Sequence, residues 1–369
     1  MTLSEFLMPT KEYTARRGPM DKIVLSSRVR LARNLFQLPF PAKAKKSVHL
    51  KILNEIKQAV QTIPDISSEG LIVSMDELSN NDKTVLVERH LISREHAKRG
   101  AGSGLAINKE ENISLMINEE DHLRMQAIFP GSQVRNAWKK IDSIDTLLGK
   151  VLNYAFHPQY GYLTACPTNL GTGIRVSAML HLPGLVLRDQ INQIINAVNK
   201  IGLAVRGIYG EGSAALGNLF QASNQMTLGI TEESIVSKLE KVINALIENE
   251  EEARRHLLAE KGQITLLNHI GRAYGILSNA YSIDSQEALN YLSLIRLGVD
   301  LGIFPHGDRS MVEELFLFIQ KGHFQLFSKD SLSTPQQRDI ARASLLREGI
   351  LKFGTPRQVK TASSSEKGI

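Results

Sequence analysis

The chain has 369 residues, of which 42% are hydrophobic and 22% are charged, a composition typical of a globular protein with about two domains. Its net charge of +6 is compatible with anionic partners, but the cations are spread along the chain, so we expect no direct contact with nucleic acid. Cys166 is the only cysteine, which excludes an intrachain disulfide and a cysteine metal site.

The N-terminus lacks a basic start followed by an apolar run, and no stretch approaches the ~20 apolar residues of a membrane span. We therefore expect no signal peptide, no membrane contact and a cytoplasmic protein.

The predicted elements change in character along the chain. Residues 1–20 form a polar N-terminal segment. Strand-like runs follow at 71–75, 84–87, 113–118, 162–168 and 174–182, with a helix at 49–61. Short strands joined by short loops favour antiparallel pairing.

From about residue 230 nearly everything is typical of helix. Thr231 is a good N-cap, a second helix is predicted to start near Asp284 and stop at Gly298, and Thr334 begins a capping box with Gln337. We expect an α+β fold with a largely antiparallel sheet flanked by helices at 21–250, an all-helical domain at 251–355 and a disordered tail at 356–369.

Four strings carry the candidate chemistry. The first is Ser26-Ser27-Arg28-Val29-Arg30, in which an extended backbone points Arg28 and Arg30 to the same face. Paired guanidinium groups suit a polyphosphate because each can bind phosphate oxygens bidentately. An ordinary charged strand face is the alternative.

The second string places Glu119, Glu120 and Asp121 after an apolar strand and before His122 and Arg124. Adjacent carboxylates there favour a metal, a cation or solvent as their neighbour. A metal site built on His122 lacks a second histidine at a useful spacing, so we expect no protein metal site, and a solvated turn is the alternative.

The third string, CPTNLGTGIR, runs from Cys166 to Arg175, and its glycines allow a loop to approach a ligand closely. A buried structural cysteine is the alternative for Cys166.

The fourth string, RGIYGEG, begins at Arg206 and places a lone carboxylate, Glu211, between glycines, for which a glycine-rich turn is the alternative. The glycines at 100–104 favour a flexible turn over a nucleotide loop, because a strand-like run follows where a helix N-terminus is needed.

Together the four strings resemble the phosphagen (guanidino) kinases, the family of creatine and arginine kinases, in order and rough spacing from about residue 23 to 229. The resemblance implies that ATP, carrying Mg²⁺, has its phosphates bound by Arg28, Arg30, Arg124, Arg175 and Arg206. It implies that Glu120 and Glu211 hold the substrate guanidinium beside Cys166. It further implies that the ATP site includes Ser26, Ser27, Val29, His90, Val176, Ser177, Ala178, Met179, Gly207, Ile208, Tyr209 and Gly210.

Three departures make the chain look like the bacterial protein-arginine kinases (the McsB group). Only 25 residues precede the first string, where small-molecule phosphagen kinases carry a helical domain. Met179 stands where that family often has histidine, and a helical region follows the catalytic strings.

A further segment of the McsB group, Arg-Asp-x-x-Arg-Ala, is matched here by Arg338, Asp339, Arg342 and Ala343. The resemblance implies a pocket in which phosphoarginine binds and activates the enzyme; a surface ion-pair cluster is the alternative. It also implies partners: proteins with exposed arginine, including a heat-shock transcriptional repressor, a Clp-type unfoldase or protease, a small activator protein, and other copies of the chain.

Phosphorylation of a guanidinium group requires carboxylates and other anionic groups beside the substrate. A guanidinium is protonated at any working pH, so an enzyme must orient it and accept a proton as the N–P bond forms. Glu120 and Glu211 can do both, and a thiolate at Cys166 would add negative charge beside the guanidinium. We expect ATP-dependent phosphorylation of arginine side chains in proteins; a small-molecule guanidino kinase and a non-catalytic phosphoarginine reader are the alternatives.

Overall fold

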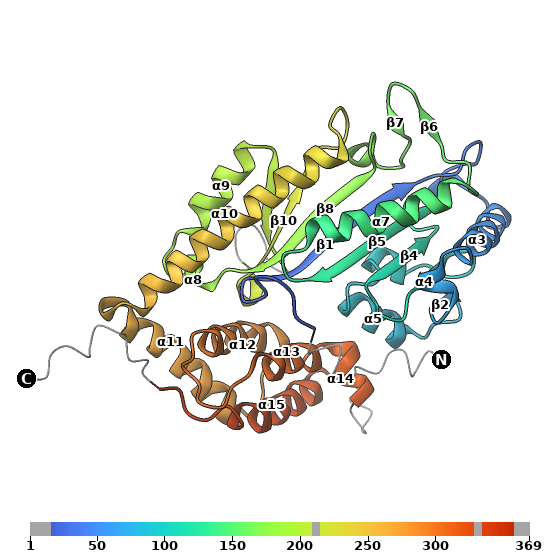
Figure 1. The fold of residues 1–369 in the computed structure, drawn as a ribbon. Coiled ribbons are helices and arrows are strands. Elements are labelled where there is room, and N and C mark those ends of the chain that lie inside the picture. The colour runs from blue at the N-terminus through green and yellow to red at the C-terminus, as the bar shows by residue number, and fades with distance from the viewer. Residues whose placement is uncertain (1–15, 209–214, 328–333, 358–369) are drawn as a thin grey trace, which may run out of the picture.

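A single antiparallel sheet organises the first two thirds of the molecule. The computed structural model describes residues 16–208, 215–327 and 334–357. Eight strands lie in the order β2-β3-β4-β5-β1-β8-β10-β9, every neighbouring pair antiparallel, with helices against the sheet and a helical region at one end (Figure 1). The expected α+β class is confirmed.

The strands of this sheet are β1 (Val24–Arg33), β2 (Leu71–Ser74), β3 (Gly104–Ile107), β4 (Ile113–Ile117), β5 (Leu123–Pro130), β8 (Ile174–His181), β9 (Leu203–Gly207) and β10 (Leu219–Asn224). A separate two-stranded pair is formed by β6 (Phe156–His157) and β7 (Gly161–Tyr162). The helices up to the end of the sheet are α3 (Lys46–Val60), α4 (Pro64–Ser67), α5 (Asn80–Glu88), α6 (Arg94–Ala97), α7 (Val134–Gly149), α8 (Pro183–Leu187) and α9 (Ile191–Lys200). They are followed by α10 (Glu232–Leu258), α11 (Glu260–Asn279), α12 (Ser285–Asp300), α13 (Arg309–Phe318), α14 (Lys321–Phe327) and α15 (Pro335–Leu351), with short 3₁₀ turns η1 (Pro41–Lys43), η2 (Pro167–Asn169) and η3 (Leu216–Asn218).

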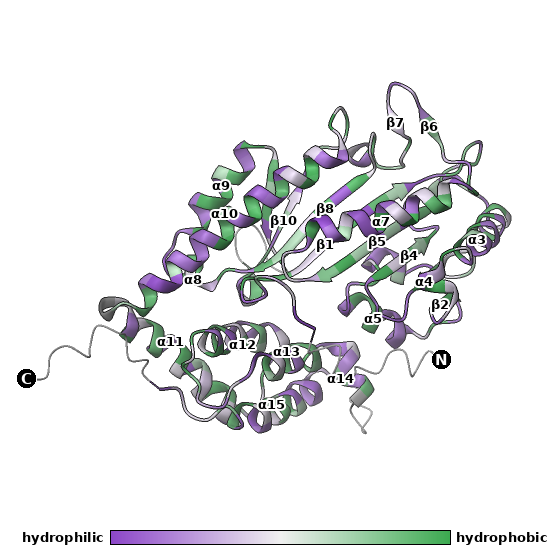
Figure 2. Cartoon of the chain, in the orientation of Figure 1, coloured by the Kyte–Doolittle hydropathy of each residue, from purple (hydrophilic) through white to green (hydrophobic). Residues whose placement is uncertain are grey.

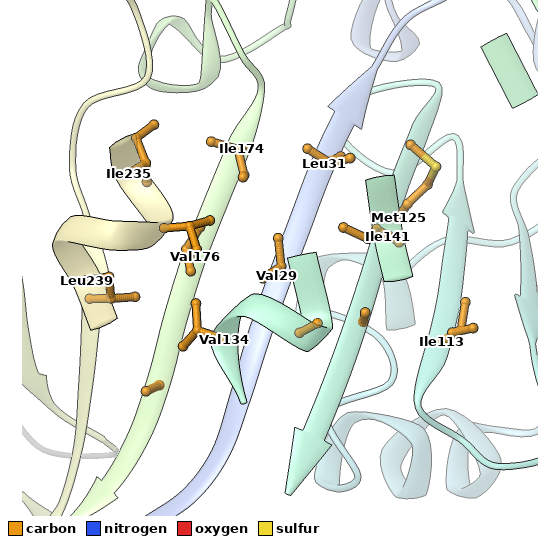
Figure 3. Packing of buried hydrophobic residues seen from close by; sticks show 14 of the residues in the cluster. Val29, Leu31, Ile113, Met125, Val134, Ile141, Ile174, Val176, Ile235 and Leu239 are labelled. Atoms are coloured by element: carbon orange, nitrogen blue, oxygen red, sulfur yellow. The ribbon is translucent and has the colours of Figure 1, made fainter. Parts of the chain in front are cut away.

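The main hydrophobic core lies between the sheet and the helices α7 and α10. Alternate residues of the strands, such as Val29 and Val176, point to this side and pack against Val134 of α7 and Leu239 of α10 (Figure 3). In Figure 2 hydrophobic and hydrophilic residues alternate along α10, as expected for a helix with one buried side. The two helices therefore cover one face of the sheet.

A second core lies within the helical region formed by α11 to α15. Leu266, Leu292, Ile295 and Phe353 are among its buried residues. The helix α10 reaches both cores, so the boundary expected at residue 250 falls inside one continuous helix. The division into domains at that residue stays a prediction.

The helix starts expected from capping residues are confirmed. The Thr231 hydroxyl accepts a hydrogen bond from the Ser234 N–H, and the Asp284 carboxylate accepts from the N–H groups that open α12. Thr334 and Gln337 form the expected capping box. No helix among the described residues is both long enough and apolar enough to cross a membrane.

Three local expectations were wrong. Residues 84–87 belong to α5 and not to a strand, because Ser79 and Asp82 form a capping box that starts a helix there. Residues 162–168 do not form a strand beside β8, since β7 ends at Tyr162 and η2 follows. The helix α12 continues past Gly298, where a Cβ would lie 2.6 Å from the Phe304 ring, so this glycine permits close packing and does not end the helix.

Candidate functional site

The strand register places the predicted arginines on the face of the sheet opposite α7 and α10. Arg30 of β1 is paired with Arg175 of β8, and Ala32 is paired with Arg124 of β5. Since paired residues share a face, Arg28 also lies on this side, together with Arg206 on β9. We call this the arginine face: Arg28, Arg30, Arg124, Arg175 and Arg206.

The same alternation explains why another arginine of the first string is not part of this face. Arg33 points to the covered side, where its guanidinium pairs with Asp145 of α7 at 2.6 Å and lies over the Tyr162 ring. Its role is to fasten α7 to the central strand.

The arginine face is electrostatically unfavourable without an anion. Burial and the repulsion from Arg124 lower the pKa of Arg28 to about 9. Burial, together with the charges of Arg28, Arg124 and Arg175, lowers the pKa of Arg30 well below its usual range. Arg30 Nε has no hydrogen-bond partner among the described residues. A polyanion would offset both the repulsion and the unsatisfied donor.

A pocket of about 210 Å³ opens at one end of this face. It is lined by Arg30, Arg124 and Arg175, and also by Glu120 and Cys166. The structure thus brings together candidates for binding phosphate and candidates for binding a guanidinium, although they come from strings far apart in the chain.

The three adjacent carboxylates of the second string have three different surroundings. Glu119 is buried and binds Arg124 at 2.7 Å. Burial opposes ionisation of Glu119, but the Arg124 charge and the Ser93 hydroxyl outweigh it and lower the pKa. Asp121 is also buried, whereas Glu120 is exposed and lines the pocket. Partial burial and the charges of Asp121 and Glu119 raise the pKa of Glu120, which makes it a better proton acceptor.

An asparagine that the sequence did not single out holds this carboxylate loop in place. Asn34 Nδ2 donates to Asp121 Oδ1 at 2.6 Å, and its Oδ1 accepts from the His122 N–H at 2.9 Å. Asp121 Oδ1 also accepts from the N–H of Ala165, the residue before Cys166, at 2.7 Å. These bonds fix the loop that carries Glu120 against the loop that carries Cys166.

His122 is part of this support and binds the backbone through both of its ring nitrogens. Its Nδ1 accepts from the Leu35 N–H at 2.9 Å, and its Nε2 lies 2.9 Å from the Pro39 carbonyl. Both ring nitrogens are therefore engaged with the backbone. The described residues contain no group of three or more metal-ligating side chains of the His, Cys, Asp and Glu types.

Cys166 is half-buried, and its side chain faces the pocket. Its sulfur lies 3.0 Å from the Thr168 hydroxyl. The alternative reading of a cysteine buried in the core is wrong.

His90, which is expected to lie near the adenine, is found at the other end of the arginine face. A larger cavity of about 840 Å³ is lined there by Arg28, His90, Met179 and Ile208. Burial, with a smaller effect of Arg28, lowers the pKa of His90 to about 4, so this histidine is neutral at pH 7.

Gln126, which the sequence did not suggest, connects Arg28 to His90. Its Oε1 accepts from Arg28 Nε at 2.9 Å, and its Nε2 donates to the His90 carbonyl at 2.8 Å. Gln126 follows Arg124 by two residues on β5, so its position on the arginine face is the signal that could have identified it.

Several residues of the expected ATP site do not have side chains on this face. Val29, Val176 and Ala178 point into the covered core. The Ser27 hydroxyl is buried and donates to the Gly131 carbonyl at 2.8 Å. Ser26 and Ser177 do lie on the same face as Arg28, and Gly207 ends β9. Tyr209, Gly210 and Glu211 lie outside the described residues.

The residues expected to bind phosphoarginine lie on the first turns of α15. Arg342 is buried, and its guanidinium binds Asp339 at 2.6 Å, the Ile283 carbonyl at 2.9 Å and the Ile319 carbonyl at 3.1 Å. Ala343 is also buried, and Arg338 is half-buried. Arg342 therefore also joins α15 to two other segments of the helical region.

Comparisons with known proteins show the family of the chain. Residues 51–253 match the family "ATP:guanido phosphotransferase, C-terminal catalytic domain", and residues 263–361 match the "Protein-arginine kinase McsB C-terminal domain". Among solved structures, lombricine kinase is similar at a TM-score of 0.55 and 24% identity, over 66% of this chain and 71% of that chain. The duplicated taurocyamine kinase from Schistosoma mansoni with bound transition-state analogue components gives a TM-score of 0.59 at 22% identity, over 81% of this chain and 49% of that one. The fold and the domain match thus define an ATP:guanido phosphotransferase.

Curated relatives make the assignment more specific. A protein-arginine kinase of Halothermothrix orenii is 47% identical over 339 residues, which cover 91% of this chain and 95% of the relative. A protein-arginine kinase of Bacillus subtilis is 43% identical over 353 residues, covering 95% of this chain and 96% of the relative. The chain belongs to the protein-arginine kinase family.

Proposed function

We propose that the chain transfers the γ-phosphoryl group of ATP to arginine side chains of proteins. The observation that carries this proposal is the pocket in which Glu120 and Cys166 face Arg30, Arg124 and Arg175. The names of the curated relatives support arginine in proteins as the acceptor.

On the nucleotide side, the arginine face binds and orients the phosphates. Arg28 and Arg30 are held by the central strand, Arg124 is braced by Glu119, and Arg175 lies opposite Arg30. Their charges stabilise the phosphoryl group in flight, when its negative charge is spread over its oxygens. Since these groups are positioned before ATP arrives, little reorganisation is needed in the transition state.

On the acceptor side, Glu120 orients the guanidinium and accepts its proton. One guanidinium nitrogen forms a bond to the γ-phosphorus as the bond from that phosphorus to the bridging oxygen of ADP breaks, and the nitrogen's proton passes to a carboxylate. The raised pKa of Glu120 suits this task. Glu211 is the second carboxylate of the proposal and lies outside the described residues.

Magnesium enters as part of the nucleotide in this proposal. It is a cation that keeps several waters and is commonly held through substrate phosphates, where it neutralises phosphate charge. Among the described residues, one carboxylate lines the same pocket as the arginines. This is Glu120, and its side chain is exposed.

The wider role that the sequence suggested stays a prediction. It comprises inactivation of a heat-shock transcriptional repressor, marking of proteins for a Clp-type protease, stimulation by a small activator protein, assembly into oligomers, a cytoplasmic location and a phosphoarginine pocket at Arg338, Asp339, Arg342 and Ala343.

The decisive experiment is to incubate the purified chain with ATP and a generic unfolded protein and to map phosphate by mass spectrometry under non-acidic conditions. Acid-labile phosphate on arginine is expected. In a parallel reaction that contains free arginine or creatine, phosphate on the free guanidino compound with none on protein would instead establish a small-molecule kinase. ATP binding without any transfer would favour a non-catalytic reader.

A further inference from the structure

The 840 Å³ cavity beside Arg28 is open to solvent and is lined by two parts of the chain. On one side it is lined by the sheet and by α5 with the turn that follows it, including Thr84, Glu88 and His90. On the other side it is lined by the helical region, which contributes Gln286, Leu289, Phe316, Gln320 and Lys321. Arg28 belongs to this cavity and Arg30 to the smaller one, two residues apart on the same face of β1. A nucleotide with its phosphates on the arginines would therefore extend its nucleoside toward the helical region.

We propose that the helical region recognises the nucleoside end of ATP, with Gln320 and Lys321 as contact residues and with Glu88 and His323 as positioning residues. The proposal rests on the proposed function, because it takes the arginine face as the phosphate site. It assigns part of nucleotide recognition to a region outside the catalytic sheet.

The two walls are joined by a cluster of hydrogen bonds at the end of α5. The Glu88 carboxylate accepts from the N–H groups of Gly322 and His323 at 2.7 and 3.0 Å, and from His323 Nδ1 at 2.7 Å. Arg89 Nε lies 3.1 Å from His323 Nε2, and Arg89 Nη1 pairs with Glu111 at 2.6 Å. We call the contact between Glu88, Arg89 and His323 the α5–α14 clamp.

The hydrogen bonds of the clamp are compatible with only one tautomer of His323, in which Nδ1 carries the hydrogen. Arg89 Nε always carries a hydrogen, so His323 Nε2 must accept and Nδ1 must donate to Glu88. Burial lowers the pKa of His323, with a further contribution from Arg89, although Glu88 opposes the shift. Neutral His323 therefore fits the clamp.

Packing at the clamp leaves little freedom for α14 to move. A Cβ at Gly322 would lie 3.0 Å from Glu88 Oε2, from Thr84 Cγ2 and from Val85 N. The start of α14 is thus seated directly on α5. Because Glu88 lines the cavity and also binds α14, a shift of α14 would change the cavity wall.

A comparison of ATP with inorganic tripolyphosphate separates nucleoside recognition from phosphate recognition. The dissociation constants of both would be measured for the full-length chain by calorimetry, without protein substrate. Gln320→Ala and Lys321→Met should each weaken ATP binding severalfold and leave tripolyphosphate binding unchanged. Lys352→Met removes the same charge from a different groove of the helical region, and it should alter neither constant.

The clamp is tested with His323→Phe, which removes both ring hydrogen bonds, and with His323→Asn, which retains a donor near the position of Nδ1. We expect His323→Phe to raise the KM for ATP about tenfold, with kcat at saturating ATP within about twofold of wild type, and His323→Asn to restore part of the loss. A merely structural histidine would lower the melting temperature without this separation of KM from kcat.

Three outcomes would overturn the inference: ATP binding unchanged in Gln320→Ala and Lys321→Met, equal losses for ATP and tripolyphosphate, or an unchanged KM for ATP in a folded His323→Phe variant. If His323→Phe does not fold, the two contact variants still decide the matter. A wild-type chain that binds neither ligand would contradict the proposed function itself, and this result is distinguishable from all three.

Discussion

Arg30 and Arg175 are register partners on the adjacent strands β1 and β8, so two guanidinium groups stand side by side on the same face of the sheet. Like charges in this position destabilise a sheet. Burial, Arg206 and Arg124 also lower the pKa of Arg175. The pair therefore destabilises the folded protein when no nucleotide is bound, and a bound polyphosphate would offset this repulsion.

Arg175→Ala should consequently have opposite effects on binding and on stability. ATP binding and phosphoryl transfer should both weaken, because the charge serves the ground state and the transition state. Without nucleotide, the melting temperature should be equal to or above that of wild type, since a repelling charge is lost. Arg175→Lys should restore binding only in part because lysine lacks the planar fork. Full activity in the alanine variant would remove Arg175 from the phosphate site.

Glu120→Ala should lower kcat by about 10²–10³ while the dissociation constant for ATP stays near the wild-type value. The reason is that Glu120 acts on the guanidinium and not on the nucleotide. Glu211→Ala should behave in the same way. Glu55→Ala, an exposed change on α3, is the matched control and should leave turnover unchanged. Near-normal turnover in either site variant would refute the role assigned to that carboxylate.

Cys166→Ser should lower activity with little effect on stability. The side chain faces the pocket, and its hydrogen-bond partner is the nearby Thr168 hydroxyl, which a serine can also bind. We expect the free energy of unfolding to stay within about 0.5 kcal/mol, as for changes outside the core. A fully active variant with a sharply lower melting temperature would instead indicate a structural cysteine.

Stability should fall as the pH falls from about 6.5 toward 4, because of histidines that are neutral in the folded chain. Burial lowers the pKa values of His90 and His96 to about 4, from the ordinary 6.5. Between these values the unfolded chain binds protons that the folded chain does not, so acid favours unfolding. His90→Asn, which suits the positive φ of 60° at this position, should make the pH dependence shallower.

The free energy of unfolding would be measured with denaturant at several pH values. An identical slope in His90→Asn and wild type would show that His90 does not titrate in this window.

Arg338→Ala should abolish stimulation by free phosphoarginine while basal activity is retained, if the pocket on α15 exists. The kinase rate would be measured while phosphoarginine is titrated into wild type and variant. Equal responses would contradict the pocket and favour the alternative, an ion-pair cluster on the helix. Arg342→Ala is less informative. It removes bonds to two buried carbonyls and should destabilise the helical region by about 1–3 kcal/mol.

The sequence is most informative where the alternation of side chains along a strand determines which face of the sheet a residue lies on, and where capping residues mark the start of a helix. The spacing of Arg28 and Arg30 placed both on one face of a strand, and the caps at Thr231 and Thr334 placed two helix starts. Residues 84–87 were misread because their apolar run resembles a strand, while the capping box before them determines a helix.

Contacts between distant segments could not be predicted. Asn34 meets Asp121 across 87 positions of sequence, and Glu88 meets His323 across 235. Neither pair has a local pattern, because the partners approach only after the sheet and the helical region have formed. The supporting residues of the site were therefore missed, although the arginine face was found.

The helix α10 also has a consequence for the way the protein unfolds. With 27 residues it is about 40 Å long, and it contributes Leu239 and Ile243 to one core and Leu257 to the other. Melting of either core would remove the packing that keeps part of this helix ordered. We therefore expect a single cooperative unfolding transition by calorimetry. Amide protons at both ends of α10 should then exchange with solvent at similar rates, as they would in one foldon.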